Sequence, residues 1–81
     1  RFVFAIYRTK EEFFMITYKP LFETLDNKGV NLFSIEKALG FSPTVTAKFR
    51  KNERVSLETI ERICMYLDVP IQDVVEVVRQ K

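Results

Sequence analysis

The sequence predicts an all-α fold, a compact bundle of five short helices in one domain, with a short pair of β-strands as an option at the chain ends. Its 81 residues suffice for one domain. Apolar residues recur at spacings of three and four along most of the chain. Residues that start helices (Asn, Ser and Pro) and a residue that ends them (Gly) separate these stretches at short intervals.

The first two helices are expected at Lys19–Lys28 and Leu32–Leu39. Pro20 suits the first turn of the former, and Asn31 suits the N-cap of the latter. A glycine follows each helix and can adopt the left-handed conformation that helix ends favour. The side chains expected to face the core are Tyr18, Leu21, Phe22, Leu25, Ile35, Ala38 and Leu39.

Three further helices are expected in the second half of the chain. Ser42 and Pro43 start the third helix, which ends among basic residues. Ser56 caps a fourth helix at Leu57–Leu67, and Pro70 starts a short fifth helix before an extended tail. The side chains expected to face the core are Val45, Phe49, Leu57, Ile60, Ile63, Cys64, Leu67, Ile71, Val74 and Val75.

Residues 1–14 differ from the rest of the chain. Phe2–Tyr7 is strand-like and nearly all apolar, and a strand needs a partner edge. The other β-rich stretch is Val74–Val78, so we expect the two ends to pair, within the chain or between two copies. A competing hypothesis takes Met15 as the natural start and residues 1–14 as a translated leader, because Lys10–Glu12 can be encoded by a ribosome-binding sequence. The expected division is therefore an N-terminal extension (1–14) and a helical domain (15–81).

The composition excludes several classes of function. The chain has no histidine and one cysteine, Cys64, which excludes a zinc site and any Ser-His, Cys-His or His-metal catalytic site. The acidic residues occupy polar positions of the expected helices, so a carboxylate-pair active site is not expected either. We therefore expect no enzyme, cofactor, metal or small-molecule substrate. A single cysteine and the lack of an apolar run of about 20 residues predict a cytoplasmic protein without a membrane span.

The basic residues are unevenly distributed. The chain has a net charge of +2, yet the stretch between the second glycine and the fourth helix alone carries +3. Its bases are Lys48, Arg50, Lys51 and Arg54, against one acid, Glu53. Such a patch can steer an anionic partner, although a solvated basic loop would look the same. Two helices joined by a tight turn, the second small, polar and basic on its outer face, are the parts of a helix-turn-helix that reads a DNA major groove.

Two runs of the chain resemble a known family. They are KGVNLFSIEKALGFSPTVTAKFRKNE (Lys28–Glu53) and VSLETIERICMYLDVPIQDVV (Val55–Val75). Both are similar to the Cro and phage-repressor type of helix-turn-helix domain (lambda-repressor-like), especially its small, stand-alone bacterial members. The resemblance implies a compact five-helix bundle that places its third helix in the major groove of double-stranded DNA, commonly as a homodimer on a palindromic site. The implied function is sequence-specific DNA binding by a transcriptional regulator, with repression as the expected output.

The resemblance also implies which residues contact DNA. The base-facing positions would be Pro43, Thr44, Ala47 and Lys48, with Lys48 donating to a guanine edge or to a phosphate. The start of the second helix would approach the DNA backbone, backbone donors beside Ser42 would hold a phosphate, and the segment after the third helix would lie near phosphates. The positions that complete this set are Asn31, Leu32, Arg50, Lys51, Asn52 and Arg54.

Four positions depart from the family pattern. Leu32 stands where a polar residue usually braces the DNA backbone, and Pro43 has no donor with which to read a base. Glu36 stands where the family often has Ala, so we expect its side chain to turn outward or to form a pair, for instance with a nearby basic side chain. Thr46 stands where a buried Ile is expected, and its hydroxyl is predicted to bond back to a carbonyl.

An alternative function uses the same fold. A protein-interaction module, such as an antitoxin or a dimerisation adaptor, would bind a protein through the apolar ends Phe2–Tyr7 and Val74–Val78. Such a module would be indifferent to duplex DNA, whereas a DNA reader would bind it in a salt-dependent manner.

Overall fold

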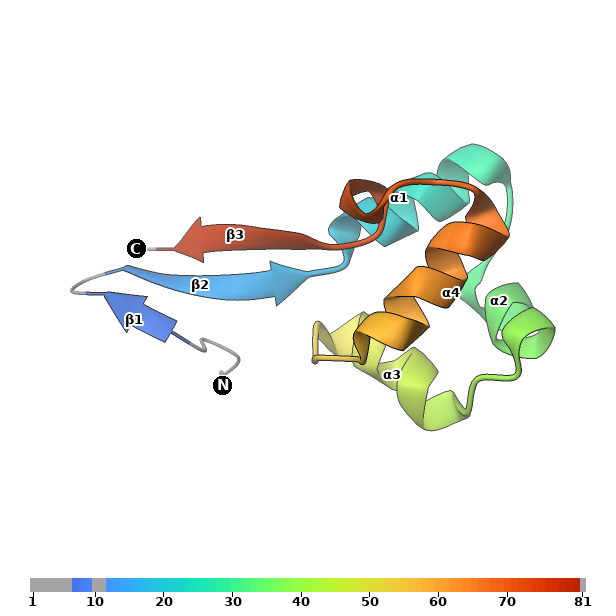
Figure 1. The fold of residues 1–81 in the computed structure, drawn as a ribbon, viewed down its shortest axis with the longest axis horizontal. Coiled ribbons are helices and arrows are strands. Elements are labelled where there is room, and N and C mark those ends of the chain that lie inside the picture. Colours follow the sequence, from blue (N-terminus) through green and yellow to red (C-terminus); the bar gives the residue numbers. More distant parts are fainter. Residues whose placement is uncertain (1–6, 10–11, 81) are drawn as a thin grey trace.

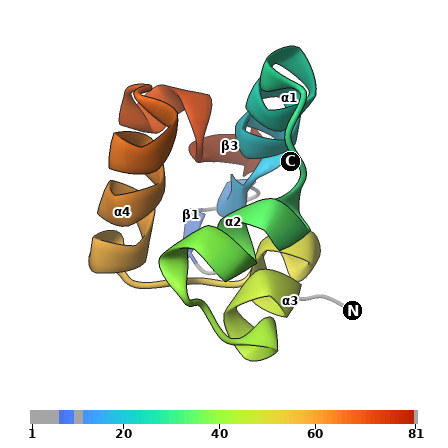
Figure 2. The same ribbon diagram turned by 90° about the vertical axis from the view of Figure 1, so that its right-hand side faces the viewer.

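Four α-helices and a three-stranded antiparallel sheet make up the fold. The computed structural model describes residues 7–9 and 12–80. The elements in chain order are β1 (Tyr7–Thr9), β2 (Glu12–Thr17), α1 (Lys19–Lys28), α2 (Leu32–Leu39), α3 (Pro43–Lys51), α4 (Leu57–Leu67), a 3-10 turn η1 (Ile71–Asp73) and β3 (Glu76–Gln80). The helices form a body at one end, and the sheet extends from it as an arm (Figure 1). Figure 2, which looks at that body end-on, shows the four helices grouped around a common centre.

Three helices begin at the capping residues that the sequence predicts. The side chains of Asn31, Ser42 and Ser56 each accept a hydrogen bond from the backbone N–H three residues later. The donor–acceptor distances are 2.8, 3.4 and 3.1 Å respectively. These contacts satisfy backbone donors that a helix start leaves without a partner inside the helix.

All four α-helices end in the same way. The residue after each helix is left-handed, with φ between 58° and 72°; these residues are Gly29, Gly40, Asn52 and Asp68. The next amide then donates to the carbonyl five residues earlier, the pattern of a Schellman motif. Glycine adopts this conformation without strain, whereas Asn and Asp tolerate it through their short polar side chains. The predicted glycine stops are confirmed.

The core lies between the helices and is closed by the residue that follows η1. Its buried side chains are Tyr18, Leu21, Leu25, Leu32, Ile35, Phe49, Ile60, Ile63, Leu67 and Val74. Three predicted core positions are wrong: Ala38, Leu57 and Ile71 are exposed, Leu57 to 77%. Leu57 is the first residue of α4, and neighbouring elements do not cover it there. The buried side of α2 is narrower than predicted, since Leu32, Ile35 and Leu39 span only about 60° of the helix at 100° per residue.

The predicted fifth helix is only the 3-10 turn Ile71–Asp73, so the all-α five-helix bundle is corrected to four α-helices plus a sheet. The chain leaves this turn through Val74, whose ψ of −44° is not extended, and it enters the strand β3 at Glu76. The turn is fastened to α1, because the Thr24 hydroxyl donates to the carbonyl of Asp73 at 2.7 Å.

The C-terminal strand pairs with a different segment from the predicted one. β3 runs antiparallel to β2, with Met15 opposite Val78 and Ile16 opposite Val77. The predicted partner, Phe2–Tyr7, lies outside the described residues except for Tyr7, which belongs to β1 and faces Phe14 of β2. β2 therefore crosses the predicted boundary between residues 14 and 15, and the origin of residues 1–14 as a leader stays a prediction. Within residues 7–9 and 12–80, no helix is long and apolar enough to cross a bilayer.

Candidate nucleic-acid interface

α3 presents one face to the core and the opposite face to solvent. Thr46 and Phe49 are buried on the inner side, and Val45 is half-buried beside them. At 100° per residue, the helical period places five of the remaining six side chains on the other side or at its edge, whereas the sixth, exposed Arg50, lies only about 40° from Thr46 around the helix. We call these five residues the outer face of α3: Pro43, Thr44, Ala47, Lys48 and Lys51. It therefore contains the four predicted base-facing residues, together with Lys51.

The predicted contacts at the helix starts differ in how their side chains are placed. Ser42, Pro43 and Thr44 are exposed at the start of α3, whereas Leu32 is 5% exposed and belongs to the core. A contact from Leu32 to DNA would therefore come from its backbone. Asn31 is exposed, but its side-chain oxygen caps α2.

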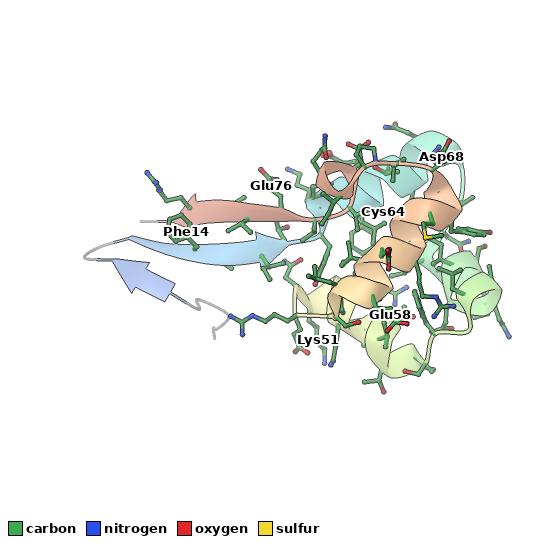
Figure 3. All side chains as sticks on the ribbon, viewed as in Figure 1. Phe14, Lys51, Glu58, Cys64, Asp68 and Glu76 are labelled. Carbon is green, nitrogen blue, oxygen red and sulfur yellow. The ribbon has the colours of Figure 1, made fainter. Side chains whose placement is uncertain are left out.

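The basic residues gather at the end of α3 and in the loop that follows. Arg50, Lys51 and Arg54 are exposed, and Lys48 is half-buried. Figure 3 shows Lys51 at the lower side of the helical body. The predicted cationic residues are thus brought to one region, where their like charges favour an anionic partner.

Asn52 has a structural role that sequence reasoning missed. Its side-chain oxygen accepts a hydrogen bond from the backbone N–H of Tyr18 at 3.0 Å, which ties the end of α3 to the start of α1. The Tyr18 hydroxyl donates to the carbonyl of Glu53 at 2.8 Å. The Tyr18 and Phe49 rings pack edge to face, with 4.7 Å between their centroids. Burial raises the pKa of the Tyr18 hydroxyl, and a hydrogen bond with the backbone of Val55 opposes this shift.

Two departures from the family pattern contact one another. The Thr46 hydroxyl donates a hydrogen bond to Glu36 Oε2 at 2.7 Å, linking α3 to α2. The carbonyl of Ser42 is a second, more distant acceptor at 3.5 Å, which agrees with the predicted bond back to a carbonyl. The observed partner of Glu36 is thus the hydroxyl of Thr46 and not a basic side chain. Sequence reasoning found each departure at its own position but not that the two side chains contact one another, because that contact joins two different helices.

The turn between α2 and α3 is braced by an arginine of α4. Arg62 donates from a guanidinium nitrogen to the carbonyl of Leu39 at 2.6 Å, and the guanidinium lies over the Phe41 ring, 5.1 Å from its centre. A cation near the end of α2 is also favoured by the partial negative charge of a helix C-terminus.

An apolar hollow lies beside this brace. Its volume is about 290 Å³, and its lining residues are Leu39, Arg62, Met65 and Tyr66. Cys64 on the same helix is half-buried, and burial, with a smaller contribution from the charge of Asp73, raises the pKa of its thiol. In the part of the chain that the structure describes, no three His, Cys, Asp or Glu side chains are grouped to hold a metal.

Comparisons with known proteins agree with this geometry. Residues 21–80 match the family model of the Cro/C1-type helix-turn-helix DNA-binding domain. Among solved structures, the chain is similar to the crystal structure of the transcriptional regulator VanUg, form II, with a TM-score of 0.80 and 27% sequence identity. That match covers 91% of this chain and 99% of VanUg. A search of curated proteins gave no match.

Proposed function

The chain belongs to the family of Cro/C1-type helix-turn-helix DNA-binding domains, and we propose that it is a transcriptional regulator that inserts α3 into the major groove of double-stranded DNA. The observation that carries the proposal is the division of α3 into a buried side, with Thr46 and Phe49, and an outer side, with exposed Thr44 and half-buried Lys48. A reading helix needs both sides, since one holds it in place while the other reaches base edges. The regulatory function named for the similar VanUg supports the same proposal.

Recognition of the DNA sequence is assigned to the outer face of α3. Lys48 is a donor that suits the O6 and N7 acceptors of guanine, and Thr44 offers a hydroxyl and a methyl group. Ala47 offers a methyl contact to thymine. Pro43 has no donor and contributes shape alone.

Affinity is assigned to the basic residues beside that face. Arg50, Lys51 and Arg54 would approach phosphates, and each phosphate neutralised releases counterions from the DNA. Asn31 and Ser42, at the starts of α2 and α3, would lie near the DNA backbone, where helix N-termini favour phosphates. Binding should then weaken steeply as salt rises.

A homodimer is part of the proposal. A single α3 makes few base contacts, and two copies on half-sites about 34–36 Å apart would double them. A dimer bound over a promoter would repress by occupancy. Sedimentation of the free protein and of its complex with duplex DNA tests the stoichiometry, with one copy per site as the contradicting result.

The test of the proposed function is selection of binding sites from random duplex DNA at near-physiological salt. An enriched palindrome is expected, because the outer face of α3 offers few but specific contacts and two-fold symmetry repeats them. Failure to enrich any sequence would contradict specific DNA reading.

A protein-interaction module remains the second candidate function. It is favoured by exposed apolar side chains away from α3: Phe33, Leu57, Met65, Tyr66 and Val77, of which Val77 on β3 is 65% exposed. Exposed apolar groups of this kind mark surfaces that seek partners. Two results together would favour this second candidate. The chain would bind all DNA duplexes equally and weakly, and it would bind a partner protein tightly.

A further inference from the structure

We propose that the hydrogen bond between Thr46 and Glu36 fixes the rotation of α3 about its own axis and so makes Glu36 a positioning residue for DNA reading. The inference rests on the proposed function, because it concerns how α3 is presented to a base pair. Neither residue lies on the outer face of α3. Both would act through the residues that do.

The pair joins the two helices of the helix-turn-helix at a partly buried point. Thr46 is 5% exposed, and Glu36 is half-buried beside the apolar stripe of α2. The distance of 2.7 Å between Thr46 Oγ1 and Glu36 Oε2 suits a hydroxyl that donates to a carboxylate. Because buried polar atoms are expensive to leave without a partner, each side chain holds the other in place.

Each half of α3 is held against the rest of the body by its own contacts. Its C-terminal half is held by the Phe49 ring against Tyr18 and by the bond from the Tyr18 amide to Asn52. Its N-terminal half carries Thr44 on the outer face and is held by half-buried Val45 and by the Thr46–Glu36 bond. In the half that would enter the groove first, the side-chain hydrogen bond that anchors α3 is therefore the one between Thr46 and Glu36.

A directional anchor matters because small rotations of a helix displace its surface. Rotating α3 by about 20° would move an atom about 5 Å from the helix axis by about 2 Å. Such a displacement breaks a hydrogen bond to a base edge, whereas flexible lysine and arginine side chains can still reach phosphates. An apolar contact at Thr46 would tolerate this sliding, while a hydrogen bond has a preferred distance and angle.

The experiment compares variants of the 81-residue chain on two duplexes, the one selected with the wild-type protein and a random one of equal length. Thr46→Val keeps the shape of the side chain and removes the hydroxyl, and Glu36→Ala removes the acceptor. Thr46→Ser and Glu36→Gln are matched controls, because each retains a group that can make the bond. Urea titrations give the folded fraction of each variant, and affinities are compared at full folding.

Thr46→Val is expected to weaken binding to the selected duplex about tenfold and binding to the random duplex by less than about twofold. The two controls should keep the ratio of the two affinities, and Glu36→Gln should shift both affinities together because it removes a negative charge. The double variant Glu36→Ala/Thr46→Val should be no worse than either single variant. An unchanged ratio for Thr46→Val, or losses that add in the double variant, would overturn the proposal. If Thr46→Val does not fold, Glu36→Ala breaks the same bond and decides the question.

A measurement without DNA separates this proposal from the proposed function. In Glu36→Ala, amide hydrogen exchange at Thr46–Lys48 should be faster than in the wild-type protein, and the increase should be larger than that at Phe49–Lys51. The reason is that only the N-terminal half of α3 loses its anchor. Equal exchange in both halves would overturn the positioning role even if the wild-type protein selects a DNA site. If the wild-type protein selects no site, the proposed function fails, and the exchange pattern alone decides whether the bond holds α3.

Discussion

The side-chain oxygen of Asn52 accepts a hydrogen bond from the backbone N–H of Tyr18, 3.0 Å away and 34 residues earlier in the chain. Asn52 is also the left-handed residue that ends α3, with a φ of 58°. A single side chain therefore ends the proposed reading helix and fastens it to the first helix of the body. Its two roles can be separated by substitution.

Asn52→Ala should lower the free energy of unfolding by about 2 kcal/mol, half from the lost hydrogen bond and half because Ala lacks the short polar side chain that lets Asn tolerate a positive φ. Asn52→Gly removes the bond without this strain and should lose about 1 kcal/mol or somewhat more, given the flexibility of glycine. Urea denaturation measures all of these values. Equal stability of Asn52→Ala and wild type would contradict both roles, and Asn52→Asp, which keeps an acceptor, is the control.

Tyr18→Phe should lower the free energy of unfolding by about 1–2 kcal/mol, because the carbonyl of Glu53 loses its donor while the contact between the ring and Phe49 is kept. Tyr18→Leu should lose more, since the edge-to-face contact of the two rings disappears as well. Equal losses in the two variants would show that the ring contact contributes nothing.

The same hydroxyl should make stability depend on alkaline pH. Its pKa is raised in the folded protein, so the folded state retains a proton that the unfolded state releases at about pH 10. The stabilisation is therefore complete below about pH 10 and is lost as the pH rises through the folded pKa. The difference in urea midpoint between wild type and Tyr18→Phe should shrink above this pH. A constant difference would contradict the burial of the hydroxyl.

Arg62→Ala should destabilise the protein by about 1–2 kcal/mol, because it removes both the bond to the Leu39 carbonyl and the cation over Phe41. Arg62→Met keeps much of the apolar stem and serves as the control for lost packing. Arg62→Lys keeps the charge but not the planar guanidinium. Thermal unfolding of the three variants ranks these contributions, and an unchanged Tm for Arg62→Ala would show that the brace is dispensable.

Lys48→Ala should weaken binding to the selected duplex by about 1–3 kcal/mol if Lys48 reads a base, with little change on random DNA. Arg50→Ala is the matched comparison, because Arg50 is assigned to phosphates and should weaken both complexes alike with a smaller salt slope. Affinities measured at several salt concentrations test both. Equal loss of Lys48→Ala on the two duplexes would reassign Lys48 to a phosphate.

The four α-helices were predicted from signals that lie within a few residues of each other, and those predictions were correct. Lys19–Lys28, Leu32–Leu39 and Leu57–Leu67 have the predicted bounds, because caps, glycine stops and apolar spacing act over a few residues. The strands were found only in part, since the predicted β-rich stretch Val74–Val78 overlaps β3 whereas β2 was not predicted. Glu12–Thr17 lies between β1 and β3, and its longer pairing is with Glu76–Gln80, about 60 residues away, which no local pattern specifies.

The sequence of this protein determined the helix-turn-helix and the residues available for a DNA-facing surface, since periodicity and capping are properties of adjacent residues. Only the tertiary structure decided that Leu57 is exposed, that Leu32 is buried and that Asn52 serves the fold. It also brought Glu36 and Thr46 together, two residues that looked like separate flaws in the family pattern. The physical reason is that burial and hydrogen-bond pairing depend on which elements meet, and neighbouring residues in the chain do not specify that.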